Sequence, residues 1–95
     1  MIKLEFDESQ IALLNEIKAP YEPERDYIMD YSIDEDCPLS ILVEYVQKSE
    51  VDYAQSSDVE VLKKAGEIAR VVDILMAYEE YAFAVYALNQ SKEAA

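Results

Sequence analysis

The chain has 95 residues, with 21 acidic and 8 basic side chains, a net charge of −13 and no histidine. This length is typical of one domain, and a hydrophobic content of 52% is sufficient for a folded core. A charge of this size disfavours direct contact with nucleic acid, whose binding depends on lysine and arginine, and with anionic membrane surfaces. One glycine and three prolines are too few for the turns of an all-β domain. We therefore expect a single, mostly α domain over residues 1–95.

Enzyme chemistry has little support in the composition. The absence of histidine removes the commonest general base and the commonest metal ligand. A single glycine excludes the phosphate-binding and dinucleotide-binding loops, which need several. Cys37 is the only cysteine, and neighbouring Asp36 disfavours its thiolate. We expect no enzyme activity, no catalytic residue, no metal and no cofactor.

Location is predicted from the cysteine count and from the N-terminus. A chain with one cysteine forms no internal disulfide, which fits the reducing cytosol. The first ten residues do not have the pattern of a signal peptide. The most apolar stretch, residues 71–88, carries Asp73, Glu79 and Glu80, which disfavours a bilayer span. We expect a soluble, cytoplasmic protein.

The N-terminal segment alternates apolar and polar residues from Ile2 to Phe6. This pattern indicates either a short β-strand or an extended arm laid on the core, and both remain open. Asp7 then has the position of an N-cap, with Gln10 three residues later as in a capping box. The pattern predicts a first helix over residues 8–18, ended by the two prolines that follow.

A second helix is predicted over residues 38–48, with Asp36 as its cap and Pro38 in its first turn. Residues 49–57 are interpreted as a connection. Ser57 and Glu60 resemble a second capping box, from which no strong breaker occurs until about residue 89. The fold class is thus two short helices and a long C-terminal helix or helical hairpin, with the N-terminal strand as an open alternative.

The C-terminal helix is apolar on most sides, since 21 of residues 59–88 are apolar. Such a helix must be covered on most sides. One alternative is a homodimer or larger assembly, and the other is a hairpin that folds back near residues 77–80. The predicted oligomer interface consists of Ile68, Val72, Leu75, Met76, Phe83 and Tyr86.

Negative charge is concentrated in the stretch from Tyr21 to Asp36. It is read as a solvated loop, as a calcium loop, or as a docking face for a basic partner. The calcium reading has Glu35 where glycine is needed and Ile41 where glutamate is needed. Interleaved tyrosines and carboxylates favour the docking face. Its predicted residues are Tyr21, Glu22, Glu24, Asp26, Tyr27, Asp30, Tyr31, Asp34, Glu35 and Asp36.

Two functions fit these patterns. The first is an acidic inhibitor or decoy, a nucleic-acid mimic that docks on a basic, nucleic-acid-binding protein. Anti-defence inhibitors carried by phages or mobile elements are the natural setting for such a protein. The second is a small helical adaptor or structural oligomer assembled through its C-terminal helix, with the acidic residues serving solubility.

Overall fold

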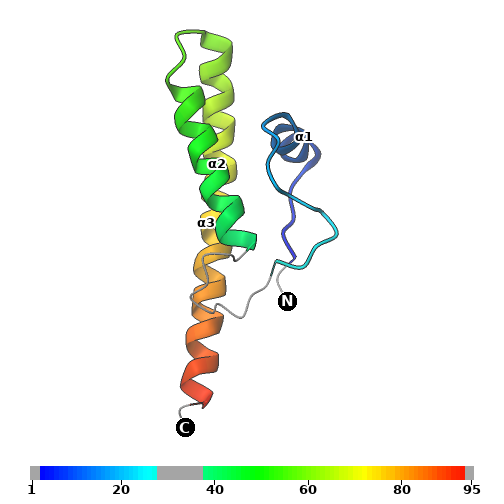
Figure 1. The fold of residues 1–95 in the computed structure, drawn as a ribbon, viewed down its shortest axis with the longest axis vertical. Coiled ribbons are helices and arrows are strands. Elements are labelled where there is room, and N and C mark those ends of the chain that lie inside the picture. The colour runs from blue at the N-terminus through cyan, green and yellow to red at the C-terminus, as the bar shows by residue number, and fades with distance from the viewer. Residues whose placement is uncertain (1–2, 28–37, 94–95) are drawn as a thin grey trace.

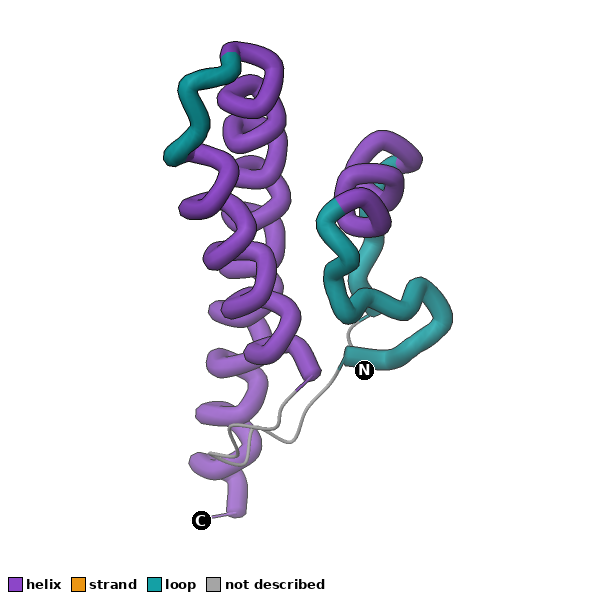
Figure 2. Tube along the Cα trace, turned by 45° about the horizontal axis from the view of Figure 1, so that its top comes forward, coloured by secondary structure: helices purple, strands orange, loops and turns teal. Residues whose placement is uncertain are grey.

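The computed structural model describes residues 3–27 and 38–93, with side chains described up to residue 88. Three helices occupy these ranges: α1 (Glu8–Glu16), α2 (Pro38–Ala54) and α3 (Val59–Glu93). Helices α2 and α3 run antiparallel as a hairpin, and α1 lies beside it (Figure 1). Figure 2 shows the same arrangement after rotation, with α1 still at one side of the hairpin. The predicted mostly α fold is confirmed.

The hydrophobic core lies between the hairpin, α1 and the N-terminal segment. No polar or charged residue is buried within residues 3–27 and 38–88, so the core is held by apolar packing and by tyrosine. Each fully buried aliphatic side chain stabilises the fold by about 1.5–3 kcal/mol. The core residues are Leu4, Leu13, Leu14, Ile17, Tyr27, Leu39, Leu42, Val43, Val46, Ile68, Val71, Val72, Leu75 and Ala82.

The N-terminal segment is an extended arm, and the structure has no strand in the residues it describes. Leu4 is buried whereas its neighbours Lys3 and Glu5 are exposed, as the alternation predicts. Its backbone groups bond to side chains instead of a neighbouring strand. The Glu5 N–H donates to the Tyr78 hydroxyl at 3.3 Å, and the Tyr21 hydroxyl donates to the Leu4 carbonyl at 3.4 Å.

Helix α1 begins at the predicted capping box and ends two residues before the predicted boundary. The Asp7 carboxylate accepts from the Gln10 backbone, and the Gln10 side chain accepts from the Asp7 backbone. At the other end Lys18 adopts a left-handed φ of 57°. The Lys18 N–H donates to Asn15 and the Ala19 N–H to Leu14, which is the Schellman arrangement that stops a helix.

Nine residues are too few for a stable isolated helix, so α1 depends on its contacts with the hairpin. Its apolar face supplies Leu13, Leu14 and Ile17 to the core. Tyr45 of α2 donates its hydroxyl to the carbonyl of Ile17 at 2.5 Å. An ion pair joins Lys64 of α3 to Glu16, and both side chains remain substantially exposed, so its contribution is small.

Helix α2 is longer than predicted, because residues 49–54 continue it instead of forming a connection. This segment contains neither glycine nor proline, and Tyr53 packs against the core. The predicted connection was therefore wrong over its first six residues. The cap of α3 also differs: the carboxylate of Asp58, not Ser57, accepts from the Glu60 N–H at 2.9 Å.

Helix α3 is continuous over 35 residues, which corrects the hairpin alternative near residues 77–80. At 1.5 Å per residue it is about 52 Å long, and the longest dimension of the molecule is 55 Å. The radius of gyration is 15.0 Å, whereas a compact domain of this size has about 12 Å. The second half of α3 extends past the N-terminal end of α2 (Figure 1). No helix in the described ranges is long and apolar enough to cross a membrane.

Gly66 is the weakest residue of α3. It is exposed, it does not have a positive φ, and an added Cβ would meet nothing within 4 Å. Alanine loses less backbone entropy on folding, so Gly66→Ala is expected to raise the free energy of unfolding by about 0.5–1 kcal/mol. Urea denaturation followed by circular dichroism measures this, and an unchanged or lower midpoint would contradict it.

The Tyr45 hydroxyl supports the end of α1 at a partly exposed position. Tyr45→Phe removes its hydrogen bond to Ile17 and should lower the free energy of unfolding by about 1 kcal/mol. Tyr81→Phe is the matched control, since the Tyr81 side chain is more exposed and its hydroxyl has no hydrogen bond within the described residues. Equal denaturation midpoints for the two variants would show that the Tyr45 bond contributes nothing.

Candidate docking site

The first part of the acidic stretch forms a loop on the side of the molecule that carries the N-terminal arm. Tyr21 lies between two aromatic rings. Its ring meets Phe6 edge to face at 5.3 Å and stacks on Tyr27 at 5.9 Å, distances that are typical of favourable aromatic pairs. Burial raises the pKa of Tyr21, helped by nearby Tyr27 and Tyr78. Its hydroxyl therefore stays protonated and able to donate to the arm at neutral pH.

The side chain of Tyr27 lies on the buried side of the loop formed by residues 21–27. Its side chain is 1% exposed, and its hydroxyl accepts the backbone N–H of Glu22 at 2.6 Å. A turn follows Glu22, with Pro23 at its second position and the Arg25 N–H bonded back to the Glu22 carbonyl. Tyr27 is thus a core residue, and the prediction that it contacts a partner is corrected. Tyr21 is also largely occupied by contacts within the chain.

Three carboxylates of the predicted docking face are displayed to solvent by this loop. Glu22, Glu24 and Asp26 are all exposed, and none of them is in an ion pair with a described residue. The tyrosines that argued for a docking face on sequence grounds instead fix the backbone that carries these charges. The result is an acidic surface with little freedom in its backbone.

The other half of the predicted docking face lies outside the described residues. This concerns Asp30, Tyr31, Asp34, Glu35 and Asp36, together with the calcium-loop interpretation and Cys37. In residues 3–27 and 38–93 there is no group of three or more potential metal-ligating side chains.

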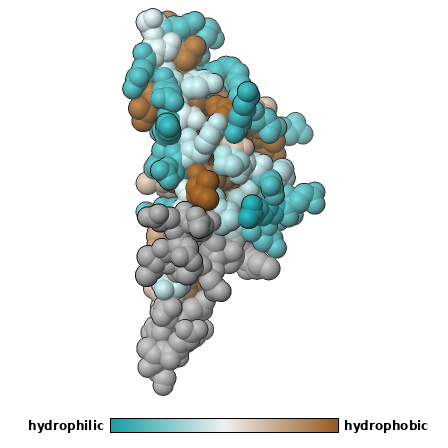
Figure 3. Space-filling view, viewed as in Figure 1, coloured by the Kyte–Doolittle hydropathy of each residue, from teal (hydrophilic) through white to brown (hydrophobic). Residues whose placement is uncertain are grey.

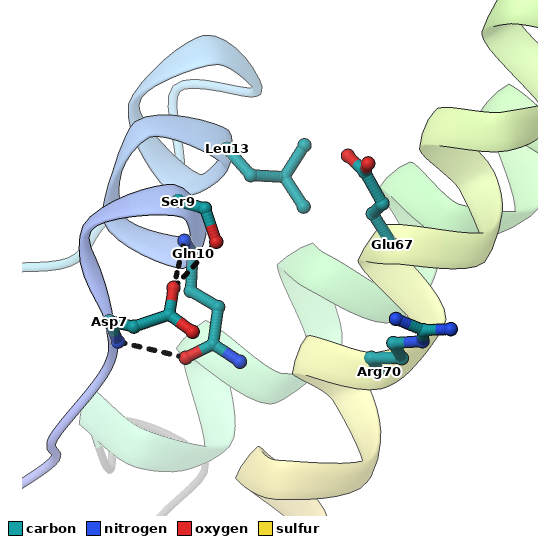
Figure 4. A pocket seen from close by; sticks show the side chains of 6 residues that line it. All are labelled: Asp7, Ser9, Gln10, Leu13, Glu67 and Arg70. Atoms are coloured by element: carbon teal, nitrogen blue, oxygen red, sulfur yellow. Dashed lines mark hydrogen bonds between the residues drawn. The ribbon is translucent and has the colours of Figure 1, made fainter.

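A cleft with a volume of about 190 Å³ lies between α1 and α3. Asp7, Ser9 and Gln10 line it from α1 and its cap, and Glu67 and Arg70 line it from α3, with Glu67 pointing toward Leu13 (Figure 4). The α1 side chains are already bonded to one another, since Ser9 and the Gln10 backbone both donate to the Asp7 carboxylate, at 2.6 and 2.8 Å. The polar groups on the α1 side of this cleft are therefore bonded within α1 and its cap.

The structure buries some residues of the predicted oligomer interface and leaves others exposed. Ile68, Val72 and Leu75 are buried in the core of a single chain, where they pack with α2 and α1. Tyr86 is partly buried against the same core. Met76 and Phe83 remain 43% and 50% exposed, and the Gln47 side chain of α2 contacts the Met76 sulfur at 3.7 Å.

Negative charge covers the surface of the described part of the molecule. None of its carboxylates is buried, and only Glu16 and Glu60 are in ion pairs there. In the coloured part of Figure 3, hydrophilic side chains cover much of the visible face, with hydrophobic patches set among them. Few of these carboxylates are paired with a basic side chain of the described residues, so they are open to an external basic partner.

Comparison with known protein families, curated proteins and solved structures gives no match for this chain.

The sequence analysis did not predict the aromatic contacts that hold the N-terminal part of the chain. Phe6 packs on Tyr21, and the hydroxyls of Tyr78 and Tyr45 bond to the backbone of Glu5 and Ile17. The alternation around Leu4 and Phe6 was the available signal, because an arm that buries alternate residues needs partners for its backbone groups.

Asp7 should make the stability pH-dependent in acid. The hydrogen bonds from Ser9 and from the Gln10 backbone hold the pKa of Asp7 below its ordinary value of 3.8. A folded-state pKa below the unfolded value gives stability that is present above pH 3.8 and lost as the pH falls through the folded-state pKa. Wild type should exceed Asp7→Asn in stability at neutral pH, and the gap should close below pH 3.8.

Thermal denaturation of both proteins across this pH range checks the expectation. Glu8→Gln is the control, because it removes a neighbouring charge whose carboxylate accepts no hydrogen bond from a described residue. A gap between wild type and Asp7→Asn that does not change with pH would contradict the role assigned to the Asp7 charge.

Proposed function

We propose that this protein is a non-enzymatic interaction module that docks through its acidic surface on a basic, nucleic-acid-binding protein. The observation that carries the proposal is the anchored loop with Glu22, Glu24 and Asp26 exposed and unpaired among the described residues. Carboxylates at fixed positions complement lysine and arginine on a partner and speed their encounter. Less ordering entropy is lost on binding when the backbone is already held.

The net charge of −13 supports the nature of the partner. A surface that binds phosphate backbones is rich in lysine and arginine, so it attracts a strongly acidic protein. Occupation of that surface would exclude the nucleic acid. An inhibitor or decoy is therefore the most concrete form of the proposal, and a phage or mobile-element protein directed against a host defence nuclease is its most natural setting. Such a protein would act in the cytoplasm.

A second candidate function is a helical adaptor or structural oligomer assembled through α3. The specific observation in its favour is the exposure of large apolar side chains near the end of that helix, Tyr81 at 59% and Leu88 at 63%. In this case the carboxylates would serve mainly to keep the protein soluble.

The docking proposal predicts a charge-reversal effect that depends on position. The triple variant Glu22→Lys, Glu24→Lys, Asp26→Lys should weaken binding to the basic partner about tenfold or more, since complementary contacts become repulsive. The control Glu44→Lys, Asp52→Lys, Asp73→Lys reverses three exposed carboxylates on α2 and α3. Both triple variants carry a net charge of −7, because three reversals add six to −13.

Pull-down from host lysate at low and moderate salt, read by mass spectrometry, identifies the partner. Titration with both variants, and competition with DNA or RNA, then test the site. Support requires salt-sensitive binding, displacement by nucleic acid and a larger loss for the loop variant. Equal losses would point to net charge alone, and undiminished binding of the loop variant would refute the docking role of this loop.

A further inference from the structure

The second half of α3 carries an apolar seam on its outward face. Ile74, Ala77, Tyr81, Ala84 and Leu88 follow one another at spacings of three, four, three and four residues. Such spacing keeps residues on one side of a helix and is the pattern by which helices pair in coiled coils. The two largest exposed members, Tyr81 and Leu88, are 59% and 63% exposed, and both alanines are also exposed.

This seam is separate from the face that packs on the rest of the chain. Ile68, Leu75 and Ala82 mark the buried line of α3. Tyr81 precedes Ala82 by one residue and Ala84 follows Ala82 by two, which places them about 100° and 160° from that line, on the same side of the helix. The orange and red part of α3, which carries the C-terminal members of the seam, extends past the end of α2 (Figure 1).

Charge identifies the occupant that this seam fits. Residues 1–60 contain 16 acidic and 4 basic side chains and carry −12, whereas residues 61–95 contain 5 and 4 and carry −1. No seam residue is charged. Two copies of a chain of −13 repel each other across most of their surfaces. The outward face near the end of α3 is therefore where a second copy meets little repulsion.

The sizes of the seam side chains favour an antiparallel pair. Positions spaced by seven hold Ile74, Tyr81 and Leu88, which are large, and the positions between them hold Ala77 and Ala84, which are small. In an antiparallel coiled coil that places Tyr81 opposite Ala84, Leu88 lies opposite Ala77. In these layers a large side chain lies opposite a small one, as close packing requires.

A parallel pair would match these positions differently. It would place Tyr81 against Tyr81 and Ala84 against Ala84, which alternates crowded layers with gaps. It would also bring the two acidic bodies side by side, whereas the antiparallel arrangement holds them at opposite ends. Helix α3 is already formed and anchored by its own core, so pairing does not require new helix formation.

We propose that two copies of this protein pair antiparallel through the seam formed by Ile74, Ala77, Tyr81, Ala84 and Leu88. The pair is isologous, with Tyr81 of each copy against Ala84 of the other and Leu88 against Ala77. This inference goes beyond the docking proposal, because it concerns a different face of the molecule and does not depend on the acidic loop. Either proposal can fail while the other holds.

Sedimentation equilibrium over a concentration series, at a salt concentration that screens long-range repulsion, measures the association. The mass should rise from the 10.9 kDa of one chain toward twice that value. Tyr81→Lys should remain a monomer at concentrations where wild type is paired. Val51→Lys on α2 is the control, since Val51 is 56% exposed and the substitution makes the same charge change. A wild-type monomer at every concentration, or pairing of Tyr81→Lys equal to wild type, would overturn the proposal.

Orientation is tested by disulfide formation in a Cys37→Ser background. A mixture of Ala77→Cys and Leu88→Cys chains should form a mixed disulfide, because these positions face each other in the antiparallel pair. Ala77→Cys alone should form none, because its two copies are then separated along the helix by 11 residues, or about 16 Å. A disulfide between two Ala77→Cys chains, in place of the mixed one, would overturn the antiparallel arrangement. Circular dichroism of each variant excludes loss of helix as the cause.

Discussion

Tyrosine hydroxyls hold the N-terminal part of the chain to the α2–α3 hairpin, and the rest of the structure depends on this attachment. Tyr78 of α3 accepts from the Glu5 backbone, and Tyr45 of α2 donates to the Ile17 carbonyl. Within the N-terminal part, Tyr21 donates to the Leu4 carbonyl. An extended arm and a nine-residue helix have backbone groups that no strand or longer helix satisfies. The rings bury apolar area while the hydroxyls satisfy these groups, so one residue type performs both tasks.

The composition of the core also determines which side chains lie on the surface. The core takes tyrosine and aliphatic side chains and admits no charged group within the described residues. Every carboxylate there is consequently outside, and few lie near a basic side chain. The acidic loop owes its position to Tyr21 and Tyr27, which lie beneath it rather than on it. The charge available for a partner is thus a consequence of how the interior is built.

Local patterns predicted most of the fold, because capping and helical periodicity are properties of short segments. The capping box at Asp7 and the start of α2 at Pro38 are where the sequence places them. The end of α2 was missed because its extra turns are held by the packing of Tyr53, a tertiary contact. The alternation of the N-terminal segment was compatible with a strand. Its backbone instead bonds to the side chains of Tyr21 and Tyr78, which makes the segment an extended arm.

The candidate sites were harder to predict, since a side chain's type does not say which way it points. A tyrosine between carboxylates suits an interface or a core, and Tyr27 belongs to the core. An apolar residue on α3 suits packing within one chain or between two, and Ile68 and Leu75 pack within one. Only after these positions are assigned to the core does the remaining seam, with Tyr81 and Leu88, become distinct.

The two proposed contact surfaces, the acidic loop and the apolar seam, are formed by different segments of the chain. The acidic loop lies beside the N-terminal arm, and the seam lies on the nearly neutral second half of α3, so the two proposed contacts use different residues. An antiparallel pair would present two acidic loops, one from each copy. Two such loops on one assembly raise the effective concentration of the second contact once the first has formed. Self-association at the seam would thereby strengthen docking on a partner that is itself dimeric, without any change in the docking surface.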